Sequence, residues 1–241
     1  MGWKVNRKRQ KFVNTLRGLW LTAVACLFVS TLLLQTGCQP GIFALLGTPT
    51  RAEAKNPAEY NLTAEKDKKI LILVDQPSSL NAQTNMRFLL TDTTANMLKQ
   101  RAKVPPEVLI DYDKLADFRA NTTDFSMMAP EKVGAALGAD LVLLITVNDF
   151  TVSDVGKSGY ANGSMIVAAE LISTSTGQRL WPEVEQARIV HVGFESEHLG
   201  PDAAAVRLAV DAAHCVIRYL YNCPQNQFKI SDEITGSGWE K

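Results

Sequence analysis

The residues best suited to chemistry in this 241-residue chain are histidines and glutamates in its last third. One group combines two of each: His191, Glu195, Glu197 and His198. A metal site needs ligands that converge. On an extended strand alternate residues share a face, so His191, Glu195 and Glu197 lie on one side and His198 on the other. The pattern favours exposed polar residues, and we expect no metal ligand.

Five aspartates lie at or near the ends of predicted strands: Asp75, Asp111, Asp113, Asp140 and Asp149. Ligand sites of α/β proteins gather at strand ends, and paired carboxylates can act as general acid and base. Aspartate is equally common in ordinary turns. A ligand-binding protein or a hydrolase therefore stays open as an alternative. Its signature would be a pocket that holds two of Asp75, Asp111 and Asp140.

Two further patterns are weaker. The run Gly156-Lys157-Ser158 looks like part of a phosphate-binding loop, but Thr151 stands where the first glycine is needed and a strand follows. His214 and Cys215 are neighbours on a predicted helix, where adjacent side chains point about 100° apart and suit no nucleophile pair. We therefore predict no catalytic residue, no cofactor and no enzymatic activity.

The most informative residue is Cys38, because of what precedes it. The first 37 residues carry six of the 25 basic residues and no acidic one, with an uncharged apolar run from Leu19 to Leu34. A basic start, an apolar stretch and small residues before a cysteine are typical of an export signal. The segment resembles a bacterial lipoprotein signal, in which the cysteine is acylated and becomes the mature N-terminus. The segment differs from the usual lipoprotein signal at Gln35, three positions before the cysteine, where lipoproteins usually have an aliphatic residue.

Two other interpretations of this segment stay open. It could remain uncleaved as a membrane helix from about Gly18 to Leu34, which is at the short limit for crossing a bilayer. It could also be cleaved without lipidation. With its basic flank held in the cytoplasm, the membrane helix would place the rest of the chain outside the inner membrane, as acylation would.

Charge limits the partners of the remaining 204 residues. They hold 19 basic and 25 acidic residues, a net charge of −6, with no basic stripe. Binding to nucleic acid needs clustered lysine and arginine, so we expect no nucleic-acid partner. We expect residues 38–67, which contain several prolines and glycines, to be an acylated N-terminus and flexible linker with a reach of about 30 Å.

The pattern of apolar residues predicts one α/β domain over residues 68–223, with a polar and loosely held tail over 224–241. The expected strands cover residues 68–77, 107–115, 139–150, 164–173 and 178–195. The expected helices cover residues 81–101, 130–137 and 200–221. The order β-α-β-α-β-β-β-α implies a mixed β-sheet with helices packed on it. Pro182 should mark a sheet edge or bulge. We see no long amphipathic hairpin, which counts against a membrane-channel subunit.

Cysteine and tryptophan residues leave further alternatives. Cys26 lies in the signal, so the domain keeps only Cys215 and Cys223. An oxidising compartment could join them in a disulfide if the last helix ends before Cys223; otherwise they are two thiols, with Cys215 buried. Trp181 is expected in the core or packed on a hairpin, with an exposed contact for a partner protein as the alternative.

Two segments of the domain resemble bacterial envelope lipoproteins. From Pro130 to Leu144, a helix ends in Leu-Gly-Ala-Asp and leads into a buried strand; from Ser175 to Trp181, a strand turns through Ser-Thr-Gly and returns through a tryptophan. Similar organisation occurs in the curli-secretion channel lipoprotein, in lipoprotein activators of penicillin-binding proteins and in the N-terminal domain of the Tol-system periplasmic protein. The resemblance implies an anticodon-binding-domain-like fold and a role as scaffold or channel subunit.

The leading hypothesis is a membrane-anchored envelope lipoprotein that acts as a non-enzymatic scaffold or interaction module in envelope assembly or secretion. Its partners would be the membrane, through the acylated N-terminus, and other envelope proteins. Gln39, rather than aspartate, resembles the signal for delivery to the outer membrane, with the domain facing the periplasm. The interface would use the sheet edge near Pro182 or the last helix. A homo-oligomeric subunit of a secretion complex is a further alternative.

Overall fold

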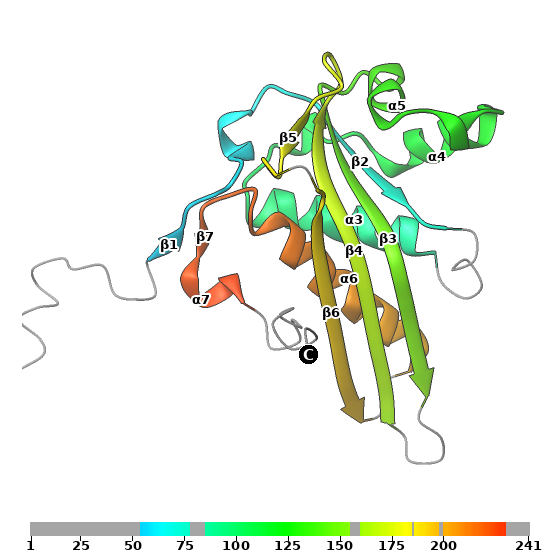
Figure 1. Ribbon diagram of the computed structural model, residues 1–241, viewed down its shortest axis with the longest axis vertical. Coiled ribbons are helices and arrows are strands. Elements are labelled where there is room, and N and C mark those ends of the chain that lie inside the picture. Colours follow the sequence, from blue (N-terminus) through cyan, green and yellow to red (C-terminus); the bar gives the residue numbers. More distant parts are fainter. Residues whose placement is uncertain (1–53, 78–84, 155–159, 185, 198–199, 230–241) are drawn as a thin grey trace, which may run out of the picture. The chain divides into compact units, whose positions relative to one another are not determined.

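The computed structural model describes residues 54–77, 85–154, 160–184, 186–197 and 200–229 (Figure 1). The strands are β1 (Lys55–Asn56), β2 (Ile70–Asp75), β3 (Leu141–Asp154), β4 (Tyr160–Ser173), β5 (Arg179–Trp181), β6 (Arg188–Glu197) and β7 (Cys223–Pro224). The helices are α3 (Met86–Gln100), α4 (Tyr112–Asn121), α5 (Pro130–Ala136), α6 (Pro201–Ile217) and α7 (Gln225–Phe228). Short 3₁₀ turns cover Leu62–Ala64, Pro106–Val108 and Phe125–Met127. This is the mixed α/β architecture that the sequence predicted.

The main sheet combines parallel and antiparallel pairing. Its order is β2-β3-β4-β5, and β6 also pairs with β4. β2 runs parallel to β3, whereas β3, β4 and β6 are antiparallel neighbours. β2 needs cover on both faces because its first five residues, Ile-Leu-Ile-Leu-Val, are all buried. The aliphatic run predicted this double burial.

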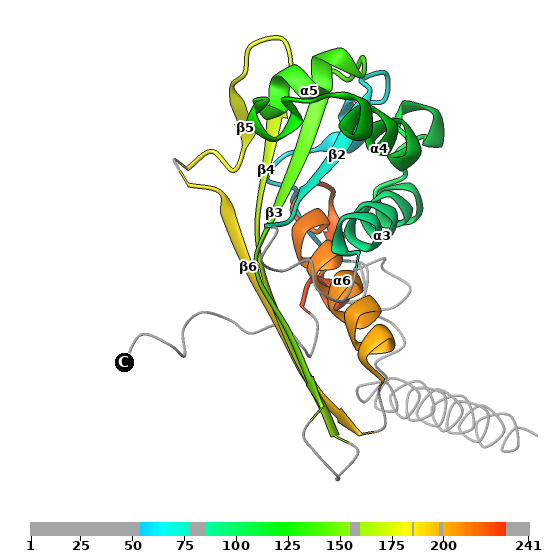
Figure 2. The same ribbon diagram turned by 90° about the vertical axis from the view of Figure 1, so that its right-hand side faces the viewer.

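Two layers of helices cover the sheet unequally. The larger core fills the space between one face and helices α3 and α6, where α6 brings a row of small residues onto the strands: Ala204, Ala205, Ala209, Ala212 and Ala213. A smaller cluster on the other face packs Leu71, Leu73 and Val142 against α4 and α5. Figure 2 shows α4 and α5 beside one end of the sheet only. The far ends of β3, β4 and β6 are therefore covered on one face.

A long hairpin is present, contrary to the sequence prediction. β3 and β4 have 14 residues each, and they pair from Leu141 with Ser173 to Asp154 with Ala161. One register shift lies between Val147 and Asp149. The predicted first strand was shorter because the four residues of β3 after Phe150, Thr-Val-Ser-Asp, include only one apolar residue. Gly163 also breaks the pattern, although it is buried beside the Phe194 ring, where a Cβ atom would approach to 2.7 Å.

The predicted strand over residues 107–115 is wrong. Leu109 makes a single parallel bridge with Ile70, and the backbone amide of Ile110 donates to the Ile70 carbonyl at 2.9 Å. Helix α4 begins directly afterwards. Leu115 and Phe118, three residues apart on α4, pack into the smaller core, which a helical period explains and an alternating one does not.

Two other boundaries also differ from the prediction. Helix α3 begins at Met86, where the Asn85 side chain accepts a hydrogen bond from the Phe88 amide at 3.2 Å. Residues 78–84, which the prediction partly assigned to this helix, lie outside the described residues. The predicted strand over 178–195 is two strands, β5 and β6, which separate at Pro182. The proline was expected to disturb pairing there.

Residues 54–67, in the second half of the predicted linker, are part of the fold, so the domain extends before Lys68. β1 pairs with β7, and Leu62 is 1% exposed within the main core. The amide of Glu59 donates to the Tyr219 carbonyl at 2.8 Å, and that of Leu62 donates to the Leu220 carbonyl at 3.0 Å. We call residues 54–64 the N-terminal strap.

The strap is held further by its own side chains. Tyr60 donates its hydroxyl to Glu65 at 3.1 Å; burial, and then this carboxylate, raise the pKa of Tyr60 to about 12. Glu65 also forms an ion pair with Lys68 at 2.8 Å, and that hydrogen bond lowers the pKa of Glu65. The phenol therefore stays neutral at every ordinary pH, so its hydrogen bond to Glu65 persists.

The beginning of the predicted loose tail is also folded. Cys223 and Pro224 form β7, α7 follows, and Phe228 packs on the main core. The Arg218 guanidinium donates to the Phe228 carbonyl at 2.6 Å. The tail is therefore part of the domain up to Lys229, the last residue described before the end of the chain.

Candidate interaction surface

The open edge of β6 is the surface best suited to binding a protein. β6 pairs with β4 over ten residues, from Arg188 with Ala169 to Glu197 with Tyr160, without a register shift. Within the part of the chain that the structure describes, no strand pairs with the other edge of β6 (Figure 1). An unpaired edge presents a row of backbone donors and acceptors to another chain.

The composition of β6 leaves the middle of this edge unprotected. Natural edge strands are commonly shielded by charged side chains, especially lysine, by proline or by a bulge. The stretch from Arg188 to Glu197 has no lysine, proline or bulge, and its charged residues, Arg188, Glu195 and Glu197, lie toward its two ends. Ile189 is 48% exposed. This strand of ten residues is about 30 Å long, and a second strand that paired with its open edge would extend the sheet.

The face of the sheet next to this edge is open as well. Rows of paired residues cross it from β3 through β4 to β6: Thr146, Ala168 and Ile189; Asp149, Ile166 and His191; Thr151, Ser164 and Gly193. None of these side chains is buried, whereas Met165, Val167 and Val192 on the opposite face are. We call these nine residues the open face; small and polar side chains predominate on it.

The predicted His–carboxylate group lies partly on this surface. His191 is half-buried and Glu195 exposed, and both belong to alternate positions of β6 that face away from α6, as the strand parity predicted. His198 lies outside the described residues, and the structure does not describe the side chain of Glu197. No group of three or more histidine, cysteine, aspartate or glutamate residues suited to a metal occurs among the described residues.

The strand-end aspartates do not form a common pocket. Asp75 ends β2 and pairs with Thr146, whereas Asp140 precedes β3 at the other end of the same strand pair. Asp140 accepts a hydrogen bond from the Lys69 amide at 2.8 Å, a structural role. Asp111 caps α4, Asp113 lies in its first turn and Asp149 lies in the long hairpin. Asp75 and Asp140 therefore do not supply the pocket that would favour a ligand-binding protein or hydrolase, because the length of β2 separates them.

Trp181 is not a partner contact. Its side chain is 0% exposed, and its indole Nε1 donates to Glu59 of the strap at 2.8 Å. The same carboxylate accepts from Arg188 at 2.6 Å. Trp181 thus belongs to the core, where it fixes the N-terminal strap to the start of β6.

The cysteines are not joined in a disulfide. Cys215 and Cys223 are both buried thiols. Helix α6 ends at Ile217, as a disulfide would require, but Cys223 pairs its backbone with β1 instead. Next to Cys215, His214 is 2% exposed; its Nδ1 contacts Arg101 and its Nε2 donates to the Gln227 carbonyl at 2.6 Å. His214 therefore ties α6 to α3 and α7.

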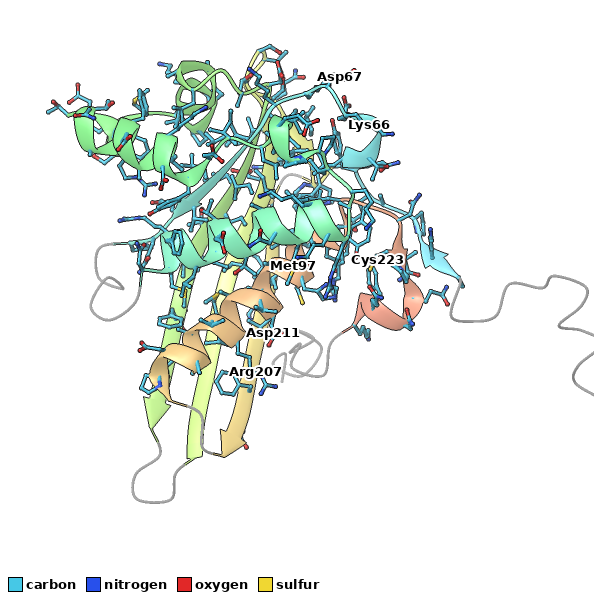
Figure 3. All side chains as sticks on the ribbon, turned by 180° about the vertical axis from the view of Figure 1, so that it is seen from behind. Lys66, Asp67, Met97, Arg207, Asp211 and Cys223 are labelled. Atoms are coloured by element: carbon cyan, nitrogen blue, oxygen red, sulfur yellow. The ribbon has the colours of Figure 1, made fainter. Side chains whose placement is uncertain are left out.

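Helix α6 offers less surface than the sequence suggested. Ten of its 17 residues are buried. Val206 and Val210 are partly exposed, and between them Arg207 forms an ion pair with Asp211 at 3.8 Å (Figure 3). The guanidinium of Arg207 also lies 4.9 Å from the centre of the Phe194 ring. The helix is mainly a core element, so the sheet edge is the stronger candidate of the two.

Sequence reasoning missed a pair of arginines at the carboxyl end of β2. Arg87, in the first turn of α3, donates to the Gln76 carbonyl at 2.7 Å, and Arg119, near the end of α4, donates to the Val74 carbonyl at 3.3 Å. Burial, and then the charge of Arg87, lower the pKa of Arg119, while Asp75 partly opposes this effect. The two residues are 32 positions apart, so no local motif marks them.

The predicted lipidation site and the Gly-Lys-Ser run lie outside the described residues, which exclude 1–53 and 155–159. Among the helices that the structure does describe, none has the length and apolar character to cross a bilayer.

Comparisons with known proteins concern the fold. No protein-family model and no curated protein matches the chain. Among solved structures, lipoprotein GNA1162 from Neisseria meningitidis is 20% identical, with a TM-score of 0.40, over 60% of this chain and 94% of its own. The PelC dodecamer from Paraburkholderia phytofirmans is 17% identical, with a TM-score of 0.37, over 69% of this chain and 93% of its own. The LpoB C-terminal domain from Salmonella enterica is 14% identical, with a TM-score of 0.31, over 54% of this chain and 82% of its own. Bacterial lipoproteins are thus among the similar structures.

Proposed function

We propose that the protein is a non-enzymatic interaction module of the bacterial envelope, tethered to the membrane through an acylated Cys38. The observation that carries this proposal is the long, unprotected edge of β6 beside the open face. The module binds a partner protein when an extended segment of that partner adds a strand to β6. Backbone hydrogen bonds along the strand supply affinity, and the open face supplies specificity.

The anchor confines the domain to a thin layer beside the bilayer. Ala54, the first residue that the structure describes, is 16 residues after Cys38. A chain of that length reaches at most about 55 Å when fully extended, and about 22 Å on average if it behaves as a flexible coil. Confinement raises the effective concentration of the edge for partners in the same layer. The residue after the cysteine, Gln39, favours the outer membrane, with the domain facing the periplasm.

The anchor can be tested by substituting the cysteine. Cys38→Ala should move essentially all of the protein from the membrane fraction to the soluble periplasmic fraction, or leave an unprocessed precursor, because no other acylation site is proposed. Intact mass of the native protein should show a diacylglycerol on Cys38. A control, Cys215→Ala, should stay in the membrane fraction. Native protein without a lipid, readily washed from cells, would contradict the proposal.

The edge can be tested with one exposed residue. Ile189→Lys places a long charged side chain on β6, which should weaken binding of a strand partner at least tenfold without unfolding a residue that is already 48% exposed. The matched control is Val184→Lys, since Val184 is 64% exposed in the connection between β5 and β6.

The measurement begins with a photo-crosslinking amino acid at position 189 of the anchored protein in cells, to identify the partner. Affinities of the purified variants for that partner then follow. Crosslinks from position 189 no stronger than those from position 132, on α5, would contradict the assignment of the surface. So would equal affinities of the two lysine variants.

A further inference from the structure

Two arginines from different helices meet at the carboxyl end of β2. Arg87 and Arg119 are both half-buried, and each donates to a backbone carbonyl of the same short stretch, at Gln76 and Val74 respectively. These hydrogen bonds hold both guanidinium groups against the backbone of residues 74–76. In open α/β sheets, the carboxyl end of a parallel strand is where ligands bind.

The positive charge of this pair is not neutralised by ion pairing. The ion pairs found among the described residues involve Lys68, Arg179, Arg188 and Arg207, and neither Arg87 nor Arg119. The Nε atom of Arg87 is buried and has no hydrogen-bond partner there. A buried donor without an acceptor is costly, so a ligand that accepts from it would stabilise the site.

The charges lie close enough to act on each other. Burial is the main cause that lowers the pKa of Arg119, and the charge of Arg87 lowers it further, as a second cation nearby does. Asp75 is the nearby carboxylate that acts in the opposite direction, and one carboxylate leaves the group with a net positive charge.

The surroundings suit an anion attached to a small organic body. Asn85 caps the 15-residue helix α3 beside Arg87, so the positive end of the helix dipole adds to the field. The Arg119 guanidinium lies 4.7 Å from the centre of the Phe125 ring, which holds it in place. Phe88 and Tyr112 stack edge to face at 5.3 Å, and Phe88 is 43% exposed.

We propose that Arg87 and Arg119 form a binding site for the phosphate group of a small soluble ligand. Phosphate fits better than a single carboxylate because it has more oxygens, which can accept from both guanidinium groups at once. The site is independent of the proposed protein interface, since β3 and β4 separate β2 from β6 in the sheet.

The test is a titration of the mature protein with inorganic phosphate at constant ionic strength, followed by calorimetry and by thermal unfolding. Phosphate should bind the native protein and raise its Tm. The double variant Arg87→Gln and Arg119→Gln should bind at least tenfold more weakly. The matched control is Arg179→Gln, whose guanidinium is paired with Glu170 and should not affect phosphate binding.

A second measurement needs no substitution. In a nitrogen-15 spectrum of the native protein, the Nε–H signal of Arg87 should shift on addition of phosphate, and chloride at equal ionic strength should leave it unchanged. Equal phosphate responses of the double variant and the control would overturn the site. So would an unchanged Arg87 signal at tens of millimolar phosphate.

Discussion

Trp181→Ala should destabilise the domain by about 3 to 5 kcal/mol, one of the largest effects expected of a single substitution here. The side chain is fully buried, and its ring centre lies 6.0 Å from that of Tyr219. Truncation removes this packing and the hydrogen bond to Glu59 together. Urea unfolding of the mature protein, followed by far-ultraviolet circular dichroism, measures the change in free energy of unfolding.

Trp181→Phe separates the two contributions. It keeps most of the buried ring but removes the indole donor, so we expect a loss of about 1 to 2 kcal/mol, much smaller than for alanine. Glu59 retains Arg188 as a partner in this variant. If Trp181→Ala cost less than about 1 kcal/mol, as is usual for surface sites, the residue would not belong to the core and the partner-contact interpretation would return.

The same residue shows why the sequence predicted some parts of the fold well. Strands β2 and β3 begin with uninterrupted aliphatic runs, and α6 has apolar residues at helical spacing, so local patterns were sufficient. Trp181 itself was correctly expected in the core or a hairpin. Its partner Glu59, 122 residues away in sequence, had no such signal.

The errors share a physical cause. The strap was interpreted as linker because it has one proline, Pro57, and mainly polar or small residues. One leucine, Leu62, and several backbone hydrogen bonds to residues 219–225 nevertheless fold it onto the domain. Tertiary contacts of this kind override local composition. At Glu107 to Leu115 the competing signal was local, because alternating apolar residues concealed the start of a helix.

The candidate sites were also predicted only in part from the sequence. Strand parity correctly placed His191 and Glu195 on one face. Pro182 predicted a sheet edge or bulge near the start of this strand, but the full length of the open edge of β6 could not be predicted, since pairing partners depend on the whole topology. The arginine pair required two helices to converge at the end of β2, and neither Arg87 nor Arg119 is unusual among the polar residues around it.

The strap connects stability with the proposed function. Because it is folded, residues 54–64 are not part of the linker that the sequence suggested, and Glu59 of the strap is fixed beside Trp181 and the start of β6. Releasing the strap would restore a longer tether that begins near Ile70. The orientation of the β6 edge relative to the membrane would then no longer be restricted.

Leu62→Ala tests that connection. Leu62 is the buried side chain of the strap, and truncating a leucine in a packed core costs about 2 to 5 kcal/mol. Because the strap has a single buried side chain and joins the domain through a few backbone hydrogen bonds, we expect the loss to appear first as local opening. Trypsin should then cleave faster at Lys55, Lys66 and Lys68, while hydrogen exchange in β3 and β4 changes little.

Val184→Ala is the matched control, because it also removes methyl groups but from a side chain that is 64% exposed. Trypsin should cleave this variant at the same rate as the native protein. Uniformly faster hydrogen exchange across β3 and β4 in Leu62→Ala would show instead that the strap and sheet unfold as one unit. In that case the tether could lengthen only by losing the whole domain, and strap opening could not regulate its reach.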